Sequence, residues 1–127
     1  MRLAVKQCEG NAAYLAEIES REENDWISSL IRDYCVKDSP WCHTWIGARD
    51  IVHEGVFTWG RYGNQVTFTH WALGQPDNAG SVEHCVHLYA DGLWNDMPCQ
   101  VSISFVCEKN IELNNQSDGV IITREQV

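Results

Sequence analysis

The sequence predicts a single α+β domain, and the order of its patterns is the main reason. Helical periodicity is confined to the first third of the chain, whereas short apolar and aromatic runs separated by Gly, Asn and Asp follow from residue 43 onward. Helices that precede strands are typical of α+β proteins, in which strands pair antiparallel. With 127 residues, the chain can form one hydrophobic core but not two.

Two helices are predicted near the N-terminus. Ser20 and Glu23 have the spacing of a capping box, which predicts a helix over residues 21–34. The apolar residues of this segment recur at helical intervals: Trp26, Ile27, Leu30, Ile31 and Tyr34. A shorter helix is predicted around residues 2–9.

Short strands and one long loop are predicted for the rest of the chain. The strand-like runs cover residues 44–48, 56–59, 66–69, 83–89 and 102–107. Between them, residues 71–84 are rich in Gly, Pro, Asn and Asp and show little apolar periodicity. A connection of this length is typical of a functional loop rather than a hairpin turn.

The cysteine content and the charge restrict the class of protein. Six cysteines in a small chain favour a disulfide framework and secretion, although six allow fifteen pairings. No segment is long enough for a signal-peptide core or a membrane span, so we expect that an export signal was removed or that the start is truncated. The formal charge is −9 and the basic residues are scattered, which excludes nucleic acid and anionic membranes and favours cations as partners.

One cluster of oxygen-bearing side chains indicates a metal site on two loops that flank a strand. Its members are Gln75, Asp77, Glu83, Asn95 and Asp96. Three carboxylates and two amides are hard ligands for Ca²⁺, which takes six to eight oxygens and would retain room for two sugar hydroxyls. The alternative interpretation is that Asp, Asn and Gln gather here because they form turns.

Several motifs between Cys8 and Cys107 resemble the C-type lectin family. The matching segments are Leu15-Ala16-Glu17-Ile18, Trp45-Ile46-Gly47, Glu54-Gly55-Val56-Phe57-Thr58-Trp59, Trp94-Asn95-Asp96 and Phe105-Val106-Cys107-Glu108. The resemblance implies a C-type lectin-like fold, a Ca²⁺ cofactor and sugar binding by the five oxygen-bearing residues. The loop sequence from Gln75 to Gly80 resembles that of perlucin-like lectins of molluscs.

The resemblance also implies a disulfide pattern. Cys8 would pair with Cys107, and Cys85 with Cys99, which would clamp the segment that carries Asn95 and Asp96. Cys35 and Cys42 lie outside the family's invariant set. They either form a local bridge or join two copies of the chain in a homo-oligomer.

The triplet Gln75-Pro76-Asp77 resembles the galactose-type triplet of the family, in which the proline is cis. Exchanging acid and amide relative to the mannose-type triplet changes which sugar hydroxyl meets a donor and which an acceptor. Residues 78–82 lack the tryptophan that strong galactose binders stack on the sugar. We therefore expect weak affinity and a specificity that extends to N-acetylgalactosamine or mannose.

A second calcium site of the family would map to Asp50, Glu54, Asn78 and Glu83. His84 stands where the family often has Asp, and imidazole is a poor Ca²⁺ ligand, which counts against this site. His84 and His87 are not expected to form a zinc pair, because residues three apart on a strand point to opposite faces.

The domain is predicted to end at residue 108. Residues 109–127 form a polar tail in which Asn115 begins a glycosylation sequon. Relatives have an N-terminal strand for which this chain has too few residues before Cys8. The tail is therefore either a loosely attached extension or an edge strand that compensates through residues 120–122.

The function expected from these features is Ca²⁺-dependent sugar binding by a secreted, non-enzymatic protein. The alternative is a lectin-like domain that acts through protein or calcium carbonate mineral surfaces, which the acidic surplus would suit. A glycosidase is disfavoured, because its carboxyl pair must flank a cleft whereas these carboxylates would be occupied by Ca²⁺.

Overall fold

The computed structural model of the chain describes residues 1–35, 42–111 and 119–125. Its elements in chain order are α1 (Arg2–Gly10), β1 (Tyr14–Leu15), α2 (Arg21–Tyr34), β2 (His43–His53), β3 (Val56–Trp59), the short 3-10 helix η1 (Ala79–Ser81), β4 (Cys85–Tyr89), β5 (Trp94–Met97), β6 (Ser104–Ile111) and β7 (Gly119–Glu125). Helices α1 and α2 precede every described strand except the two-residue β1, and the predicted α+β class is confirmed.

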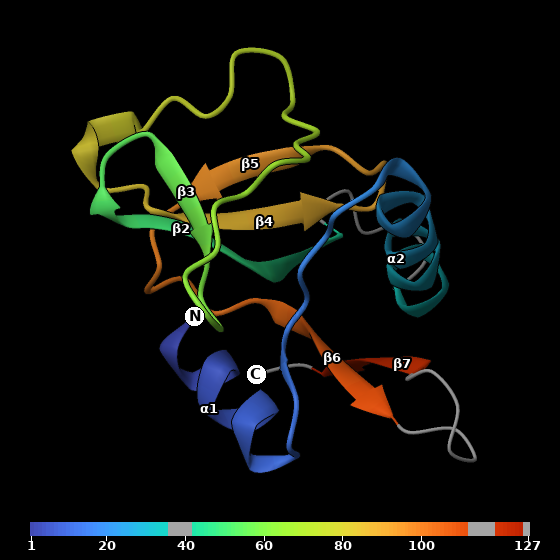
Figure 1. Cartoon of the computed structure of the whole chain (residues 1–127). Helices are drawn as coiled ribbons and strands as arrows, with labels where there is room; N and C mark the ends of the chain where they lie inside the picture. Colours follow the sequence, from blue (N-terminus) through green and yellow to red (C-terminus); the bar gives the residue numbers. More distant parts are fainter. Residues whose placement is uncertain (36–41, 112–118, 126–127) are drawn as a thin grey trace.

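The strands form one mixed sheet that is mostly antiparallel. The main order is β1-β6-β2-β4-β5, with β3 added beside β2 and β7 beside β6. Among the strands of the described residues, only β2 and β6 run parallel, with Thr44 opposite Ser104 and Trp45 opposite Phe105. Figure 1 shows α1 and α2 on separate sides of the sheet and the long segment between β3 and β4 arching over its far end. This segment carries the predicted functional loop.

Helix α2 begins and ends at the predicted residues. Its N-cap is Ser20, whose Oγ accepts a hydrogen bond of 3.1 Å from the Glu23 backbone N–H. The helix buries Ile27 and Ile31, which lie four residues apart on one face and join the main core. The capping residue and the apolar spacing are local signals, and this explains why the sequence sufficed for this element.

The core has two parts that meet at the central strands. The larger part lies under α2 and contains Ile27, Ile31, Ile46, Val86 and Trp94, all fully buried. The smaller part lies under α1 and includes the disulfide cysteines Cys8, Cys85 and Cys107. Side chains along β2 and β4 alternate between these two parts, so both faces of the sheet are covered.

All six cysteines form disulfides within the chain. Cys8 pairs with Cys107, Cys35 with Cys42, and Cys85 with Cys99, and the Cα–Cα distances are 5.5, 5.9 and 5.2 Å respectively. The first and third pairs are those that the resemblance implies. For Cys35 and Cys42 the local bridge is the arrangement found, which leaves no cysteine for a bond to a second copy.

Two local predictions were wrong. Residues 66–69 form no strand, since Val66 and Phe68 pack on the core from a loop. Apolar side chains in this segment therefore reflect burial of a loop rather than pairing in the sheet. Conversely, Trp94-Asn95-Asp96 belongs to strand β5, not to a loop, because it pairs antiparallel with β4. Asn and Asp have low strand propensity, so this pairing comes from the neighbouring strand.

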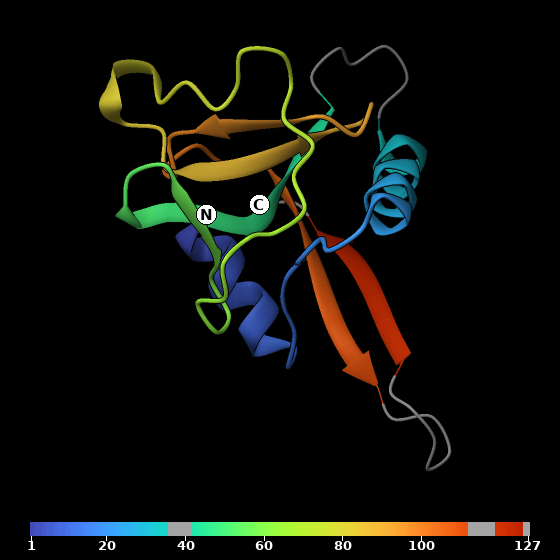
Figure 2. The same cartoon turned by 45° about the horizontal axis from the view of Figure 1, so that its top comes forward.

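The C-terminal region contains an edge strand. β6 continues past the expected boundary at residue 108 and ends at Ile111, and β7 pairs with it antiparallel from Phe105 opposite Glu125 to Ile111 opposite Gly119. Figure 2 shows this hairpin extending away from the other strands. Of the two alternatives for the tail, the structure has the edge strand, whereas Asn115 lies outside the described residues.

Candidate functional site

Three carboxylates from separate parts of the chain meet beside the long loop. Asp77 and Glu83 lie in the segment between β3 and β4, and Asp96 lies on β5. One oxygen of each carboxylate lies within 4.8 Å of the others. Three of the five predicted ligands are thus shown to converge, although they are up to 19 residues apart in the sequence.

Asp96 is the buried member of this cluster and bonds to the backbone of the loop. Its side chain is buried, and its two carboxylate oxygens accept hydrogen bonds from the backbone N–H groups of Asp77, at 3.2 Å, and Asn78, at 2.7 Å. These bonds attach the loop to strand β5 and hold Asp77 against it.

Glu83 closes the cluster from the other end of the short helix η1. Its Oε1 accepts from the Ala79 N–H at 2.9 Å, and its own N–H donates to Asn78 Oδ1 at 3.0 Å. Desolvation raises the pKa of Glu83, the Ala79 N–H partly opposes this, and the nearby Asp77 and Asp96 raise the pKa further. The three carboxylates therefore repel one another, and a bound cation would relieve this repulsion.

The two predicted amide ligands, Gln75 and Asn95, carry oxygen atoms of a different kind. Gln75 Oε1 and Asn95 Oδ1 are buried and have no hydrogen-bond partner. Among the described residues only two further side-chain atoms share this property, Glu23 Oε1 and Thr44 Oγ1. A buried oxygen without a partner costs about 1–3 kcal/mol, so a cation that accepts both amide oxygens as ligands fits these positions.

Sequence position links these oxygens to the carboxylates. Gln75 is joined by a cis peptide bond to Pro76, directly before Asp77, and Asn95 precedes Asp96 on β5. The structure records no contact between either amide oxygen and the three carboxylates. The structure thus brings the three carboxylates together and leaves the two amide oxygens, on residues near them in the sequence, without a partner.

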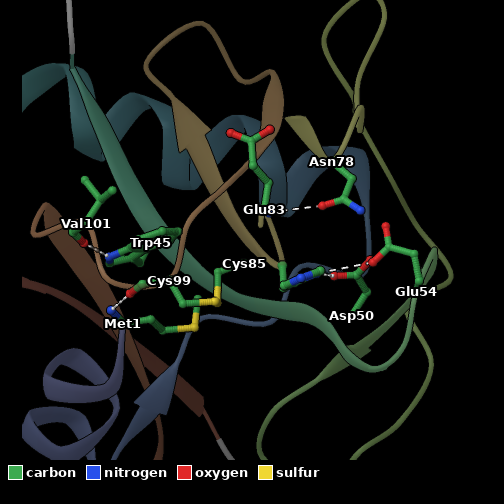
Figure 3. The surroundings of a disulfide bond; sticks show 10 residues. Met1, Trp45, Asp50, Glu54, Asn78, Glu83, Cys85, Cys99 and Val101 are labelled. Atoms are coloured by element: carbon green, nitrogen blue, oxygen red, sulfur yellow. Dashed lines mark hydrogen bonds and ion pairs between the residues drawn. A yellow bond between two sulfur atoms is a disulfide. The ribbon is translucent and has the colours of Figure 1, made fainter. Parts of the chain in front are cut away.

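The four residues of the expected second calcium site do not form one group. Asp50 and Glu54 both contact His84, whose Nδ1 lies 3.2 Å from Asp50 Oδ1 and from Glu54 Oε2. Asp50 is buried, and its Oδ2 accepts from the Gly55 N–H at 2.9 Å. Figure 3 shows the Asp50 and Glu54 side chains near each other and the hydrogen bond between Asn78 and Glu83. Asp50, Glu54 and His84 form a second cluster whose ligand atoms lie within 4.8 Å of one another, and one member of this cluster is an imidazole rather than a carboxylate.

Two histidines that sequence reasoning did not assign to the site lie directly behind it. His87 on β4 is buried, and its Nε2 lies 2.9 Å from the side-chain nitrogen of Asn95. Its Nδ1 lies 2.8 Å from Nδ1 of His43 on β2. No sequence motif marks this pair, because the two residues become neighbours only through the pairing of β2 with β4.

A separate cavity lies far from the acidic loop. It has a volume of about 330 Å³ and is lined by parts of α1, β1 and β2, including Tyr14, Arg49 and Arg61. The Arg61 guanidinium stacks on the Tyr14 ring at 3.8 Å from its centroid. None of the predicted ligands lines this cavity.

The arrangement of the loop and β5 suits recognition better than catalysis. Carboxylate and amide oxygens around one point are ligands for a hard cation such as Ca²⁺. Neither histidine nor cysteine belongs to the cluster formed by Asp77, Glu83 and Asp96, so the ligands that zinc prefers are missing from it. In the described residues, no helix has the length and apolar character needed to cross a membrane.

Comparisons with known proteins identify relatives for most of the chain. A family model described as "Lectin C-type domain" matches residues 1–109. Perlucin from Haliotis laevigata is 38% identical over 109 residues, which cover 84% of this chain and 67% of perlucin. The galactose-specific lectin nattectin from Thalassophryne nattereri is 35% identical over 105 residues, covering 82% of this chain and 64% of nattectin.

Solved structures show the same fold. C-type lectin CEL-I from Cucumaria echinata superposes with a TM-score of 0.74 at 28% identity, covering 84% of this chain and 79% of that chain. The mouse scavenger receptor C-type lectin carbohydrate-recognition domain superposes with a TM-score of 0.69 at 28% identity, covering 98% of this chain and 81% of that one.

Proposed function

Because this chain belongs to the C-type lectin domain family, we propose that it binds carbohydrate through a Ca²⁺ ion held on the long loop and on β5. The proposed ligands of both ion and sugar are Gln75, Asp77, Glu83, Asn95 and Asp96. Membership of the family supports carbohydrate binding in general, and its members generally bind sugars without transforming them. The dependence on Ca²⁺ and the type of sugar are the specific parts of the proposal.

One observation carries the calcium proposal. The two amide oxygens of the expected ligand set are buried without partners, and they belong to residues one or two positions away in the sequence from members of a carboxylate cluster whose oxygens lie within 4.8 Å of one another. Together they supply five of the six to eight oxygens that Ca²⁺ takes. When bound, Ca²⁺ would offer its remaining coordination positions to two vicinal hydroxyls of a sugar.

The side chains would recognise the same hydroxyls directly. Carboxylate oxygens of Asp77 and Glu83 can accept hydrogen bonds from hydroxyl groups, and the amide N–H groups of Gln75 and Asn95 can donate to them. The order of amide before acid in Gln75-Pro76-Asp77 is the basis for proposing galactose as the preferred sugar. One relative, nattectin, is named galactose-specific, which agrees with this choice.

Affinity for a single sugar is expected to be weak. The exposed apolar side chains near the site are Leu73 and Val82, and neither offers an aromatic ring for the apolar face of a sugar. We therefore propose that galactose, N-acetylgalactosamine and, more weakly, mannose are accepted. Binding to cell surfaces would then depend on several sites engaging at once.

The decisive experiment is calorimetric titration of galactose and of mannose, each with Ca²⁺ and with a chelator. Wild type is compared with Asp96→Asn and with Asp33→Asn, which makes the same charge change at an exposed position on α2. We expect wild type and Asp33→Asn to bind galactose only with Ca²⁺, and Asp96→Asn to lose at least tenfold in affinity. Sugar binding that survives chelation would contradict the proposal.

A second experiment concerns the number of ions. Since His84 contacts both Asp50 and Glu54, we propose that one Ca²⁺ binds tightly and that the second site is weak. Titration of Ca²⁺ alone is expected to show a stoichiometry of one. His84→Asp would restore a carboxylate there, and a second binding event in this variant is the expected result.

The alternative function is contact with proteins or calcium carbonate surfaces, for which the formal charge of −9 is the supporting observation. It predicts that Ca²⁺ binds while neither sugar does. For either function, three disulfides favour an extracellular location.

A further inference from the structure

His87 lies at the centre of the sheet, directly behind a proposed calcium ligand. Its strand, β4, runs between β2 and β5, and His87 is the register partner of Trp45 on one side and of Asn95 on the other. The side chain is 1% exposed. A ring buried in this way is neutral and has one N–H donor and one acceptor nitrogen.

The contacts of this ring determine where its proton lies. The amide nitrogen of Asn95 can only donate, so His87 Nε2, 2.9 Å away, is the acceptor. The proton of a neutral ring must then be on Nδ1, which donates to His43 Nδ1 at 2.8 Å. Asn95 therefore donates to His87, and His87 donates to His43, so that two hydrogen bonds in the same direction join the three side chains.

Aromatic contacts hold the His87 ring in this orientation. The Tyr89 ring lies edge-on at 4.7 Å between centroids, and the Trp45 ring lies at 6.2 Å. His43 in turn stacks on Tyr89 at 6.0 Å. The ring is buried between strands and rings on several sides, so it offers Asn95 an acceptor in a set position.

The amide of Asn95 has two ends, and His87 holds only one of them. With its nitrogen bonded to His87, the oxygen Oδ1 is left at the other end of the group, buried and without a partner. We propose that His87, itself oriented by His43, is a positioning residue that keeps the Asn95 oxygen available to the cation. This inference rests on the proposed function, since it names what orients one ligand of that site.

Reversing the direction of these two hydrogen bonds would turn the Asn95 oxygen away from the position in which it can bind the cation. If His43 donated to His87, the proton of His87 would lie on Nε2, and the Asn95 oxygen would turn to accept it. The NH₂ group would then occupy the place of the oxygen, and an N–H group cannot coordinate a cation. Partners that orient metal ligands typically change metal affinity by roughly 10–100-fold when they are removed.

The test compares variants that keep or remove the acceptor. His87→Gln places an oxygen near the position of Nε2, where it can accept from Asn95, whereas His87→Asn can replace only the partner of His43. Calcium titration is expected to show near wild-type affinity for His87→Gln and roughly 10–100-fold weaker binding for His87→Asn and for His87→Phe. His53→Phe, at an exposed position on the same strand as His43, is the control and should bind Ca²⁺ like wild type.

A second readout does not depend on calcium. Nitrogen-15 NMR of the metal-free wild-type protein should show His87 with its proton on Nδ1 and His43 with its proton on Nε2. A proton on His87 Nε2 would overturn the inference, as would equal calcium affinity of wild type, His87→Asn and His87→Phe. If wild type itself binds no Ca²⁺, the proposed function fails, and the NMR result alone then decides the orientation of Asn95.

Discussion

Two asparagines, the buried Asn24 on α2 and the half-buried Asn95 on β5, mark the framework of this domain and its proposed binding surface. Both ends of the Asn24 amide are bonded: Oδ1 accepts from Trp94 Nε1 at 2.8 Å, and Nδ2 donates to the Gly92 carbonyl at 2.9 Å. Asn95 donates to His87 but its oxygen has no partner. Trp94, the residue that Asn24 bonds, is adjacent to Asn95 in the sequence. The two environments therefore lie at neighbouring positions of β5.

The comparison shows how a strand can serve two purposes. On one face of β5, Trp94 is buried in the core and tied to the helix by Asn24. Gly92, with φ of 91°, lies so close that a Cβ would be 3.2 Å from the Asn24 amide nitrogen. Both ends of the Asn24 amide have hydrogen-bond partners within the chain, whereas the Asn95 oxygen would gain a partner only from outside it.

The largest effect is expected for Asn24→Leu. The substitution keeps the size of the side chain but leaves Trp94 Nε1 buried without its partner and removes the Asn24 bond to the Gly92 carbonyl, which retains only its contact with His70 Nδ1 at 2.6 Å. We therefore expect a loss of about 3 kcal/mol in the free energy of unfolding. Urea unfolding measures this loss. Asn95→Leu in a chelator is the matched substitution, with an expected loss of about 1 kcal/mol. Equal losses would remove the distinction between the two regions.

The next effect concerns calcium-dependent stability. At a Ca²⁺ concentration of 100 times Kd, wild type should gain about 2.7 kcal/mol in the free energy of unfolding. Asn95→Leu should gain little, because it lacks the amide oxygen, whereas Asn24→Leu should gain as much as wild type. The measurement is urea unfolding with Ca²⁺ and with chelator. A full calcium gain in Asn95→Leu would argue against Asn95 as a ligand.

The smallest effect comes from Glu23, whose buried Oε1 also lacks a partner although it lies in the framework. Burial, and then the charge of Glu108, raises the pKa of Glu23 to about 7. The folded protein therefore binds more protons than the unfolded chain between the ordinary glutamate pKa and about 7, and stability falls as the pH rises through this range.

Glu23→Gln should accordingly stabilise the protein above pH 7 by about 1 kcal/mol, a value reduced because solvent partly screens the side chain, and should have little effect at pH 4. Thermal unfolding at both pH values measures this. Glu22→Gln changes an exposed carboxylate in the same turn and should leave the thermal stability unchanged at both pH values. A gain from Glu23→Gln that does not depend on pH would rule out its ionisation as the cause.

Local signals account for the elements that were predicted correctly. The Ser20 cap and the spacing of Ile27 and Ile31 define α2 within one stretch of chain. Residues 66–69 were assigned wrongly because apolar side chains alone do not show whether a segment pairs with a strand or packs as a loop. The same limit applies to β5, whose Asn and Asp resemble a loop until β4 lies beside them.

The candidate site divides in a similar way. The residue types and the triplet before Asp77 identified which oxygens to consider, and three of the five lie in one cluster in the structure. The contacts of His84 with Asp50 and Glu54 follow from folding, since these residues come from separate strands and a hairpin. The residue type of a carboxylate does not show whether it already has a side-chain partner or is available to a cation.

The sequence by itself determined the class of fold, helix α2, the family motifs and the chemical nature of the proposed ligands, because each depends on residues close together in the chain. Only the tertiary structure decided that Asp77, Glu83 and Asp96 meet, that the Asn95 oxygen is left open and that His87 lies behind it. These features depend on strand register and burial, and both arise from contacts between residues that are distant in the sequence.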